Sequence, residues 1–414
     1  MKQEILKKVL KSRKNLIVSG SVSTGKTLNV VQPLVEEYIK EETSLLILDS
    51  KEEYINKYYN ELKNKNYNII ILNIRNMERS EGWNPLDYPY VLYKNNEKDK
   101  ALEYIEKIFK TIFYEEGSFD PFWSNTAADF LIGITLSLFE DGNKEEINFN
   151  SVSNIVDMID KKINTKSYLD NYFEMKKNTS IAYKYVASTL LSPPETKGSI
   201  LSVVRQKLRM YVTREDLSML MNKTTFKYEN ILNKPTAIFV INKDESKSFN
   251  TIAAMFIEQI FSYLIENNKN KKFNFILDNF DTIENINELP EKLYSSLARN
   301  IKFIVTTHCF DNLISKYNSY IKNSSDLMIV EDNLIKYTPD NIIETIENNL
   351  EKVAFYDIPY PAINKEKIKL FDVENIVKEN YKKKSSSENN QLHDKVSLDD
   401  LIKRIDEKLD KLEE

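Results

Sequence analysis

Glycine, cysteine and histidine are scarce in this sequence of 414 residues, which contains seven, one and two of them. The single cysteine, Cys309, excludes a disulfide within the chain and is typical of a reducing compartment. Acidic residues outnumber basic ones, and a net charge of −5 gives no overall positive field to attract nucleic acid. Any contact with DNA would therefore need a local basic patch or a lined pore.

Long apolar runs are also absent from the sequence. A helix that crosses a bilayer needs about 20 mostly apolar residues. The best candidate, Ala127–Phe139, is shorter and carries Asp129, so we interpret it as a buried helix. The first 15 residues lack the apolar core of a secretory signal peptide. We therefore expect a cytoplasmic protein, which would need a partner to be held at the inner face of the cell membrane.

The apolar residues that are present divide the chain into segments. Short buried runs alternate with helical spacing at both ends of the chain, a pattern that indicates βαβ units and a parallel sheet. The runs that we predict as strands are 15–20, 44–50, 67–74, 236–242, 273–280, 301–308 and 325–332. Helical periodicity alone fills residues 98–220. We predict an α/β fold of the RecA-like P-loop kind, with a mostly parallel sheet built from residues 1–97 and 221–378 and an all-α domain inserted at 98–220.

The end of the chain has a different character. Residues 379–395 are polar and of low complexity, which predicts a disordered linker. Residues 396–414 follow as an amphipathic helix with apolar residues spaced 4, 3, 4 and 3, namely Leu398, Ile402, Ile405, Leu409 and Leu412. Two heptads are too few to distinguish a helix packed on the body from one that docks a partner.

Two of the seven glycines lie in a motif for binding phosphate, G-x-x-x-x-G-K-T, between a predicted strand and a predicted helix. Gly20 and Gly25 let the backbone wrap a phosphate chain, Lys26 supplies a positive charge, and Thr27 offers a hydroxyl to Mg²⁺. The alternative is a chance match on a surface turn. We predict binding of ATP and Mg²⁺ by the whole loop, Gly20, Ser21, Val22, Ser23, Thr24, Gly25, Lys26 and Thr27.

Use of the nucleotide requires an acidic residue at the end of a second buried strand. Asp278 is the best candidate for the metal, because it ends an apolar run late in the chain. Asp49 is a rival that follows the first helix. The next residue, Asn279, can orient a water but cannot accept its proton. Asp281 and Glu284 are nearby carboxylates that could substitute.

Several stretches together resemble the conjugative coupling proteins of the TraG/TraD type, the DNA-pumping ATPases of type IV secretion. Besides the phosphate loop, they are LILDSKEEY, RSEGWNPLDYP, DPFWSNTAADFLIG, KGSILSVVRQKL and LNKPTAIFVI. The first is similar to the family's strand ending in Asp-Pro-Lys-Gly-Glu, with Ser50 in place of Pro and Glu52 in place of Gly. The resemblance covers roughly residues 15–317, and the tail is similar to the end of soluble members from Gram-positive bacteria.

The resemblance implies a RecA-like nucleotide domain with an all-α domain, a hexameric ring with ATP sites between subunits, and DNA in the channel. It implies that Arg299 acts in trans or senses phosphate, although a surface arginine at a helix end fits equally. The family's catalytic Glu is Asn279 here. Its γ-phosphate-sensing Gln is His308, which can still donate a hydrogen bond. Typical members also carry transmembrane helices before the phosphate loop.

Three functions fit these observations. The first is a coupling-protein ATPase that moves single-stranded DNA and its relaxase to a membrane-anchored secretion channel, with Asp278, Asn279, Arg299 and His308 as catalytic candidates and Thr27 and Asp278 at the metal. The second is a degenerate, non-hydrolysing relative that binds ATP and acts as an adaptor or regulatory subunit. The third is a DNA translocase or helicase of another RecA-like type, against which the WNPL and DPFW elements argue.

Overall fold

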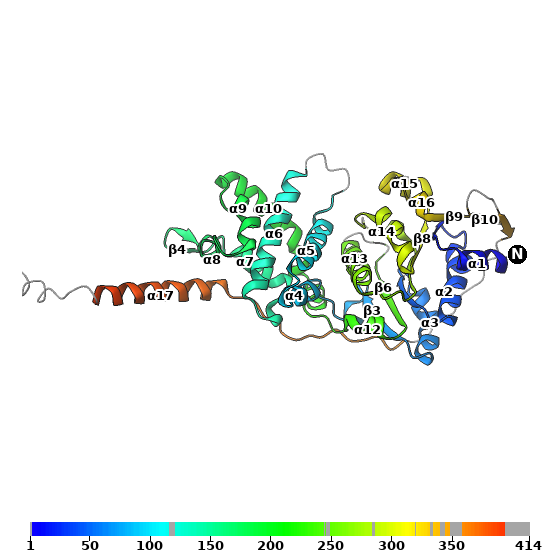
Figure 1. Ribbon diagram of the computed structural model, residues 1–414, viewed down its shortest axis with the longest axis horizontal. Coiled ribbons are helices and arrows are strands. Elements are labelled where there is room, and N and C mark those ends of the chain that lie inside the picture. Colours follow the sequence, from blue (N-terminus) through cyan, green and yellow to red (C-terminus); the bar gives the residue numbers. More distant parts are fainter. Residues whose placement is uncertain are drawn as a thin grey trace, which may run out of the picture.

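The chain forms two packed parts, one built around a sheet and one built only of helices (Figure 1). The structure is a computed structural model that describes residues 2–115, 121–243, 245, 249–283, 286–318, 320–331, 334–339, 344–347 and 358–393. The two parts lie side by side in an elongated molecule, and the last described helix, α17 (Val373–His393), extends from the helical end.

Within the described residues, the main sheet has nine strands in the order β11-β10-β9-β1-β8-β7-β2-β6-β3. The strands from β9 to β3 are parallel, and β10 and β11 add an antiparallel edge. Their bounds are β1 (Asn15–Ser19), β2 (Ser44–Leu48), β3 (Asn68–Asn73), β6 (Thr236–Ile241), β7 (Phe273–Leu277), β8 (Ile301–Thr307), β9 (Ser325–Val330), β10 (Leu334–Thr338) and β11 (Glu344–Glu347). Every run predicted as a strand forms one, which confirms the mostly parallel α/β fold.

Helices cover both faces of the sheet, as a parallel sheet requires. Side chains alternate along each strand, so Leu16 and Val18 face one layer and Ile17 faces the other. The first layer contains α1 (Lys2–Lys11), α2 (Gln32–Lys40) and α3 (Glu53–Asn64). The second contains α12 (Tyr228–Asn233), α13 (Asn250–Asn267) and α14 (Leu289–Ser296). Two short helices, α15 (Phe310–Tyr317) and α16 (Ile321–Ser324), follow β8.

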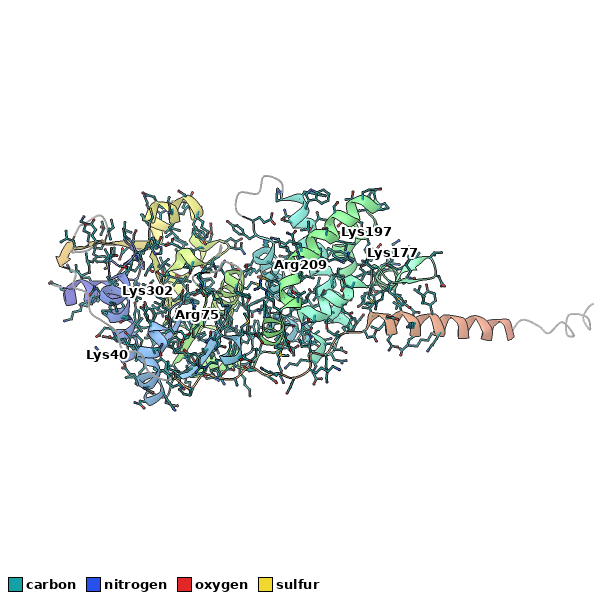
Figure 2. All side chains as sticks on the ribbon, turned by 180° about the vertical axis from the view of Figure 1, so that it is seen from behind. Lys40, Arg75, Lys177, Lys197, Arg209 and Lys302 are labelled. Atoms are coloured by element: carbon teal, nitrogen blue, oxygen red, sulfur yellow. The ribbon has the colours of Figure 1, made fainter. Side chains whose placement is uncertain are left out.

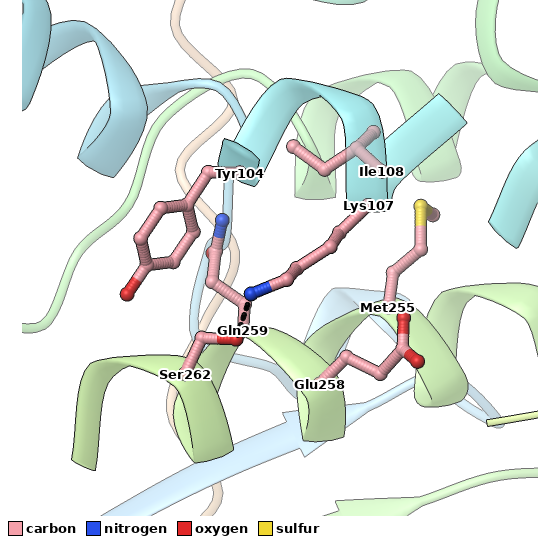
Figure 3. Close-up of a pocket in the computed structure, with 7 residues that line it drawn as sticks. All are labelled: Tyr104, Lys107, Ile108, Met255, Glu258, Gln259 and Ser262. Atoms are coloured by element: carbon pink, nitrogen blue, oxygen red, sulfur yellow. Dashed lines mark hydrogen bonds between the residues drawn. The ribbon is translucent and has the colours of Figure 1, made fainter. Parts of the chain in front are cut away.

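The helical part joins the second layer without a break in the core. Its members are α4 (Asp87–Lys94), α5 (Lys98–Phe113), α6 (Phe122–Asp141), α7 (Phe149–Asp157), α8 (Tyr168–Lys176), α9 (Ile181–Leu190), α10 (Pro194–Thr213) and α11 (Glu215–Leu220), with a small hairpin of β4 (Lys162–Ile163) and β5 (Lys166–Ser167). Helix α13 is buried along most of its length because it lies between the sheet and α5. A small pocket between α5 and α13 is crossed by a hydrogen bond from Lys107 Nζ to Ser262 Oγ, 3.2 Å (Figure 3).

The WNPL element lies at the junction of the two parts. The Trp83 ring is fully buried, packs edge-on against Phe256 and donates from Nε1 to Gln259 Oε1 at 2.8 Å. Asn84 Nδ2 donates to the carbonyl oxygens of Ile147 at 2.5 Å and Asn222 at 3.0 Å. These contacts tie the chain leaving β3 to both α13 and the helical part, so the element has a structural role.

The end of the described chain differs from two sequence-based predictions. Residues 358–372, here called the strap, leave the sheet part and run along the helical part instead of belonging wholly to the nucleotide domain (Figure 1). Helix α17 then continues to His393 where a linker was predicted at 379–395. Pairs such as Lys378–Glu374 at 2.6 Å support a polar helix, which low complexity alone does not reveal. The helix predicted at 396–414 lies outside the described residues.

No helix in the described part of the chain is long and apolar enough to cross a membrane.

Candidate nucleotide site

The predicted phosphate loop, Gly20–Thr27, connects β1 to a turn of π-helix, η1 (Thr27–Val31), that leads into α2. Gly25 has a φ of 82°, a left-handed conformation that glycine adopts without steric penalty. Gly20 is needed for a different reason. A Cβ on Gly20 would collide with the backbone carbonyl oxygen of Val330 at the end of β9. Glycine is therefore required at position 25 by the backbone conformation and at position 20 by the close approach of β9.

The middle of the loop closes on itself. Thr24 Oγ1 donates to the carbonyl oxygen of Ser21 at 3.0 Å, and Ser23 has a φ of 67°. The Val22 side chain is 71% exposed. The loop thus presents a tight backbone arch with one apolar side chain toward solvent.

Lys26 is folded over this arch. Its Nζ donates to the carbonyl oxygens of Gly20 at 2.5 Å and Ser21 at 2.8 Å. Burial lowers the pKa of Lys26, and the charges of Asp278 and Asp281 oppose that fall. The ammonium group therefore lies near two carboxylates of the segment that follows β7, at the place where a bound phosphate would need a counter-charge.

Asp278 follows β7 and is 5% exposed. Three hydroxyl groups donate to its carboxylate: Thr27 Oγ1 at 2.8 Å, Tyr54 OH at 2.7 Å and Thr306 Oγ1 at 2.5 Å. Burial first, and then the Asp278 charge, raise the pKa of Tyr54 well above its ordinary value, so the phenol stays a donor. The structure thus brings Thr27, which follows β1, together with Asp278, which follows β7, as the sequence predicts.

Asp281 and His308 form a second polar pair beside the first. His308 follows β8, and the carbonyl oxygen of the preceding Thr307 accepts a hydrogen bond from the Gly20 amide at 3.2 Å. Asp281 Oδ2 accepts from the His308 amide at 2.6 Å and lies 2.7 Å from its Nδ1. Asp281 Oδ1 accepts from Thr307 Oγ1 at 2.7 Å.

Asn279 adopts a left-handed conformation, with φ of 52° and ψ of 48°, which asparagine tolerates better than most residues. Its amide donates to Thr306 Oγ1 at 2.8 Å and to Asp278 Oδ1 at 3.1 Å. The residue is therefore at the site, where its backbone helps to hold Asp278. Glu284, one of the predicted substitute carboxylates, lies outside the described residues.

Asp49 has another role. Its Oδ2 accepts from the amides of Tyr54 at 3.1 Å and Ile55 at 2.8 Å, so it caps the start of α3. The capped turn carries Glu53, whose pKa is raised by burial and by Asp278 and lowered by Lys51. The segment after β2 therefore borders the site, but Asp49 itself points into the helix end.

Arg299 is not part of this cluster. It precedes β8 at the amino edge of the sheet and donates from Nη1 to the Ser295 carbonyl oxygen at 2.8 Å. The phosphate loop follows the parallel strand β1 at the carboxyl edge. The seven residues of β8 separate the two edges by roughly 20 Å. Arg299 therefore cannot reach the nucleotide site of its own chain.

Sequence reasoning missed two residues that contact Asp278. Thr306 is the neighbour of Asp278 because β8 lies between β1 and β7, and only the strand order reveals this. Tyr54 reaches Asp278 from the first turn of α3, because β2 lies on the other side of β7. The one sequence signal for either contact was the pair of threonines, Thr306 and Thr307, at the end of β8.

The donor set suits a hard cation that keeps most of its own water. Within the described residues, no three side chains of His, Cys, Asp and Glu gather as a metal cage. The adjacent oxygens of Thr27 and Asp278 instead match Mg²⁺, which binds through one or two protein oxygens together with phosphate.

A phosphate loop on β1, an acidic residue on β7 and one strand between them define a P-loop nucleotide-binding protein of the RecA-like class. The family model described as type IV secretory system conjugative DNA transfer matches residues 9–327, and the chain belongs to that family. No curated protein sequence matches it.

Solved structures with the same fold have little sequence in common with this chain. The bacterial conjugative coupling protein TrwBdeltaN70, in a trigonal form with sulphate, has a TM-score of 0.61 at 11% identity, covering 84% of this chain and 89% of that one. The plasmid coupling protein TrwB in complex with ADP and Mg²⁺ has a TM-score of 0.61 at 12% identity, over 84% and 89% of the two chains. TrwB has also been solved with the ATP analogue ADPNP, with a TM-score of 0.61 at 11% identity over 85% and 89%.

Proposed function

We propose that this protein binds ATP with Mg²⁺ and uses its hydrolysis to drive single-stranded DNA and the attached relaxase toward a type IV secretion channel. The observation that carries the proposal is the contact of Thr27 with Asp278 beside Lys26, at the carboxyl edge of the sheet. The TrwB structures with ADPNP and with ADP and Mg²⁺ support the choice of ligand.

Each residue of the cluster has a role in this proposal. Lys26 exchanges the loop carbonyl oxygens for the β- and γ-phosphates. The Thr27 hydroxyl and the Asp278 carboxylate hold Mg²⁺, which when bound neutralises charge on the phosphates. Tyr54 and Thr306 keep the Asp278 carboxylate in one orientation through their hydroxyl groups.

The partners belong to the proposal as well. Family membership supports DNA and a membrane-anchored channel component as partners, with the protein at the inner face of the membrane. Arg299 lies at the far edge of the sheet, so any action on ATP requires a neighbouring subunit, as in the proposed hexamer. The basic side chains labelled in Figure 2 are spread over both parts of the molecule, with Lys177, Lys197 and Arg209 on the helical part and Lys40, Arg75 and Lys302 on the sheet part.

Asn279 favours a second function. The residue after Asp278 cannot take a proton from water. A chain that binds ATP without hydrolysing it would act as a nucleotide-dependent adaptor of the same secretion machinery, with the predicted helix at 396–414 as a docking element.

Measurement of ATP turnover separates the two functions. The purified chain is assayed with Mg²⁺, with and without single-stranded DNA, beside Lys26→Ala. ATP binding is followed in parallel with a fluorescent analogue. We expect turnover that rises with DNA and is lost in Lys26→Ala.

ATP binding without turnover under every condition would contradict the motor and support the adaptor. Absence of ATP binding in the folded wild-type chain would contradict both. Asp278→Asn tests the metal, because it should weaken binding in Mg²⁺ while changing metal-free binding little.

A further inference from the structure

The Asp281–His308 pair lies on the phosphate side of the candidate site. His308 directly follows Thr307, whose carbonyl oxygen accepts the amide of Gly20, the first residue of the phosphate loop. The Asp281 carboxylate is close enough to Lys26 for its charge to oppose the fall in the pKa of that lysine. The side chains of His308 and Asp281 are 38% and 30% exposed, so water can reach the imidazole.

Hydrogen bonds fix the carboxylate that faces the ring. Asp281 accepts from three donors: the Thr307 hydroxyl, the His308 amide and His308 Nδ1. An ionised carboxylate only accepts hydrogen bonds, so Nδ1 carries the proton of a neutral His308. The lone pair is then on Nε2. Within the described part of the chain, no residue donates a hydrogen bond to that atom.

This tautomer excludes one role and permits another. A neutral imidazole protonated on Nδ1 cannot donate from Nε2 to a γ-phosphate, which is what the resemblance implied for this position. It can accept a proton there. Hydrolysis needs a proton acceptor other than residue 279, because Asn279 occupies the position at which the resemblance implies a catalytic Glu.

We propose that His308 is the general base of ATP hydrolysis in this protein and that Asp281 is its positioning residue. This inference rests on the proposed function, since it requires that ATP is hydrolysed. The oxygen of a water attacks the γ-phosphorus while its proton passes to Nε2 of His308. The bond from the γ-phosphorus to the β,γ-bridging oxygen breaks, and its electron pair leaves with ADP. Asp281 stabilises the imidazolium, which then returns the proton to solvent.

The tautomer can be measured without any turnover. The sequence has two histidines, His308 and His393, so a ¹⁵N-histidine-labelled sample gives a simple spectrum in which His393→Gln identifies the His308 signals. We expect a neutral ring of His308 with the proton on Nδ1. A neutral ring with the proton on Nε2 would overturn the proposal.

Turnover of His308→Gln separates a base from a phosphate sensor. Glutamine is the residue of the resembling family and donates a hydrogen bond, but it cannot take a proton. We expect turnover to fall about 10²–10⁴-fold, the usual contribution of a general base, with ATP binding unchanged. Restoring a carboxylate with Asn279→Glu in the His308→Gln background should recover part of the loss.

Asp281→Asn tests positioning through the pH profile. Lys26 is the charged side chain that interacts with Asp281, and Asp278 and Lys51 in turn act on Lys26. Asp281→Asn removes the charge that stabilises the protonated imidazole, so the acid limb of the turnover profile should move to lower pH. A residue with only a structural role would lower turnover without moving that limb.

The outcomes distinguish this inference from the proposed function. Wild-type turnover that persists in His308→Gln overturns the general base and leaves the motor standing. If turnover is lost in Glu53→Gln but retained in His308→Gln, the general base is Glu53. That result would also overturn the assignment to His308. Complete absence of turnover in a wild-type chain that binds ATP overturns the motor and the base together.

Discussion

Gly20 lies where the phosphate loop passes closest to the end of β9. A Cβ at this position would meet the Val330 carbonyl oxygen, which is backbone and cannot swing away. We expect Gly20→Ala to lower the free energy of unfolding by about 1–3 kcal/mol, the usual penalty for overpacking. The displaced loop should also lose ATP binding. Urea unfolding and titration with a fluorescent ATP analogue check the two effects.

A matched control for Gly20→Ala exists on α10. A Cβ on Gly198 would have open space around it. Gly198→Ala should therefore leave ATP binding unchanged and add about 1 kcal/mol of stability, because alanine favours a helix. Equal ATP affinities for the two variants would show that the approach of β9 does not constrain the loop.

Asp49 gives a prediction for the dependence of stability on pH. Burial raises the pKa of its carboxyl from 3.8 to about 7, against the hydrogen bonds that it accepts from α3. The folded chain therefore keeps a proton that the unfolded chain loses between about pH 4 and 7, so this group lowers stability as the pH rises through that window. Asp49→Asn keeps an acceptor for the helix end and removes the ionisation.

Relative to wild type, Asp49→Asn should gain stability between pH 4 and 7, on the order of 4 kcal/mol at about 1.4 kcal/mol per pKa unit. The gain should be constant above pH 7. Urea unfolding of both proteins at a series of pH values measures it. A difference that does not change with pH would mean that Asp49 is ionised throughout.

At the same scale, spacing predicted the phosphate loop because its function depends on consecutive residues. Asp278 was predictable for a similar reason, since it ends an apolar run. Tyr54 and Thr306 were not, because their proximity to Asp278 arises from the order of strands β2, β7 and β8. Arg299 was a candidate by resemblance alone. The direction of β8 puts it at the amino edge of the sheet, opposite the nucleotide site of its own chain.

At the scale of elements, α13 connects the sheet to the helical part through one buried charge. Glu258 on α13 is 3% exposed, accepts from Thr111 Oγ1 of α5 at 2.7 Å, and lies 3.5 Å from Lys292 Nζ of α14. Burial raises the pKa of Glu258 and lowers that of Lys292, while each charge opposes the shift of the other. Each group is tolerated in the core because its partner is present.

Lys292→Met should therefore cost about 3–5 kcal/mol, because it leaves Glu258 without its counter-charge. The double variant Glu258→Gln/Lys292→Met should recover most of that loss. A double-mutant cycle from urea unfolding gives the coupling energy. Additive effects of the two single variants would show that the pair is not coupled.

Strands were the most predictable elements in this chain. Each of the seven predicted strands was a short, mostly buried apolar run, and parallel pairing follows from the helices between them. Helix α17 was the clear failure, because residues such as Lys382 and Glu379 have a polar composition that suits either a helix or a linker. The register and order of the strands, which create the site, involve partners hundreds of residues apart and leave no local pattern.

At the scale of the whole molecule, the strap links the surroundings of the nucleotide site to the helical part. Tyr360 OH donates to Glu52 Oε2 at 2.5 Å, one residue before the α3 turn that carries Glu53 and Tyr54. Farther along, Asn148 and Asn154 of the segment around α7 donate to strap carbonyl oxygens at 2.9 Å. A movement of the helical part relative to the sheet would therefore displace the strap and, through Tyr360, the segment next to the nucleotide site.

Phe371 anchors the strap on the helical part. It is 4% exposed, its amide donates to Ser151 Oγ at 3.1 Å, and its ring lies 6.4 Å from that of Tyr172. The adjacent Leu370 is 49% exposed and serves as a matched control. Phe371→Ala should lower the free energy of unfolding by about 3–5 kcal/mol, whereas Leu370→Ala should change it by about 0.5 kcal/mol or less.

Hydrogen exchange would show where Phe371→Ala acts. Amides of α7 and α8 should exchange faster, because the strap and the start of α17 cover them, while amides of β1 and β8 should keep their protection. Tyr360→Phe acts at the other end and should raise exchange in residues 49–54 alone. If Phe371→Ala and Leu370→Ala unfold at the same urea concentration, the strap is not seated on α7. The helical part would then be coupled to the nucleotide site through the core contacts of α5 and α13 and through the WNPL element, without the strap.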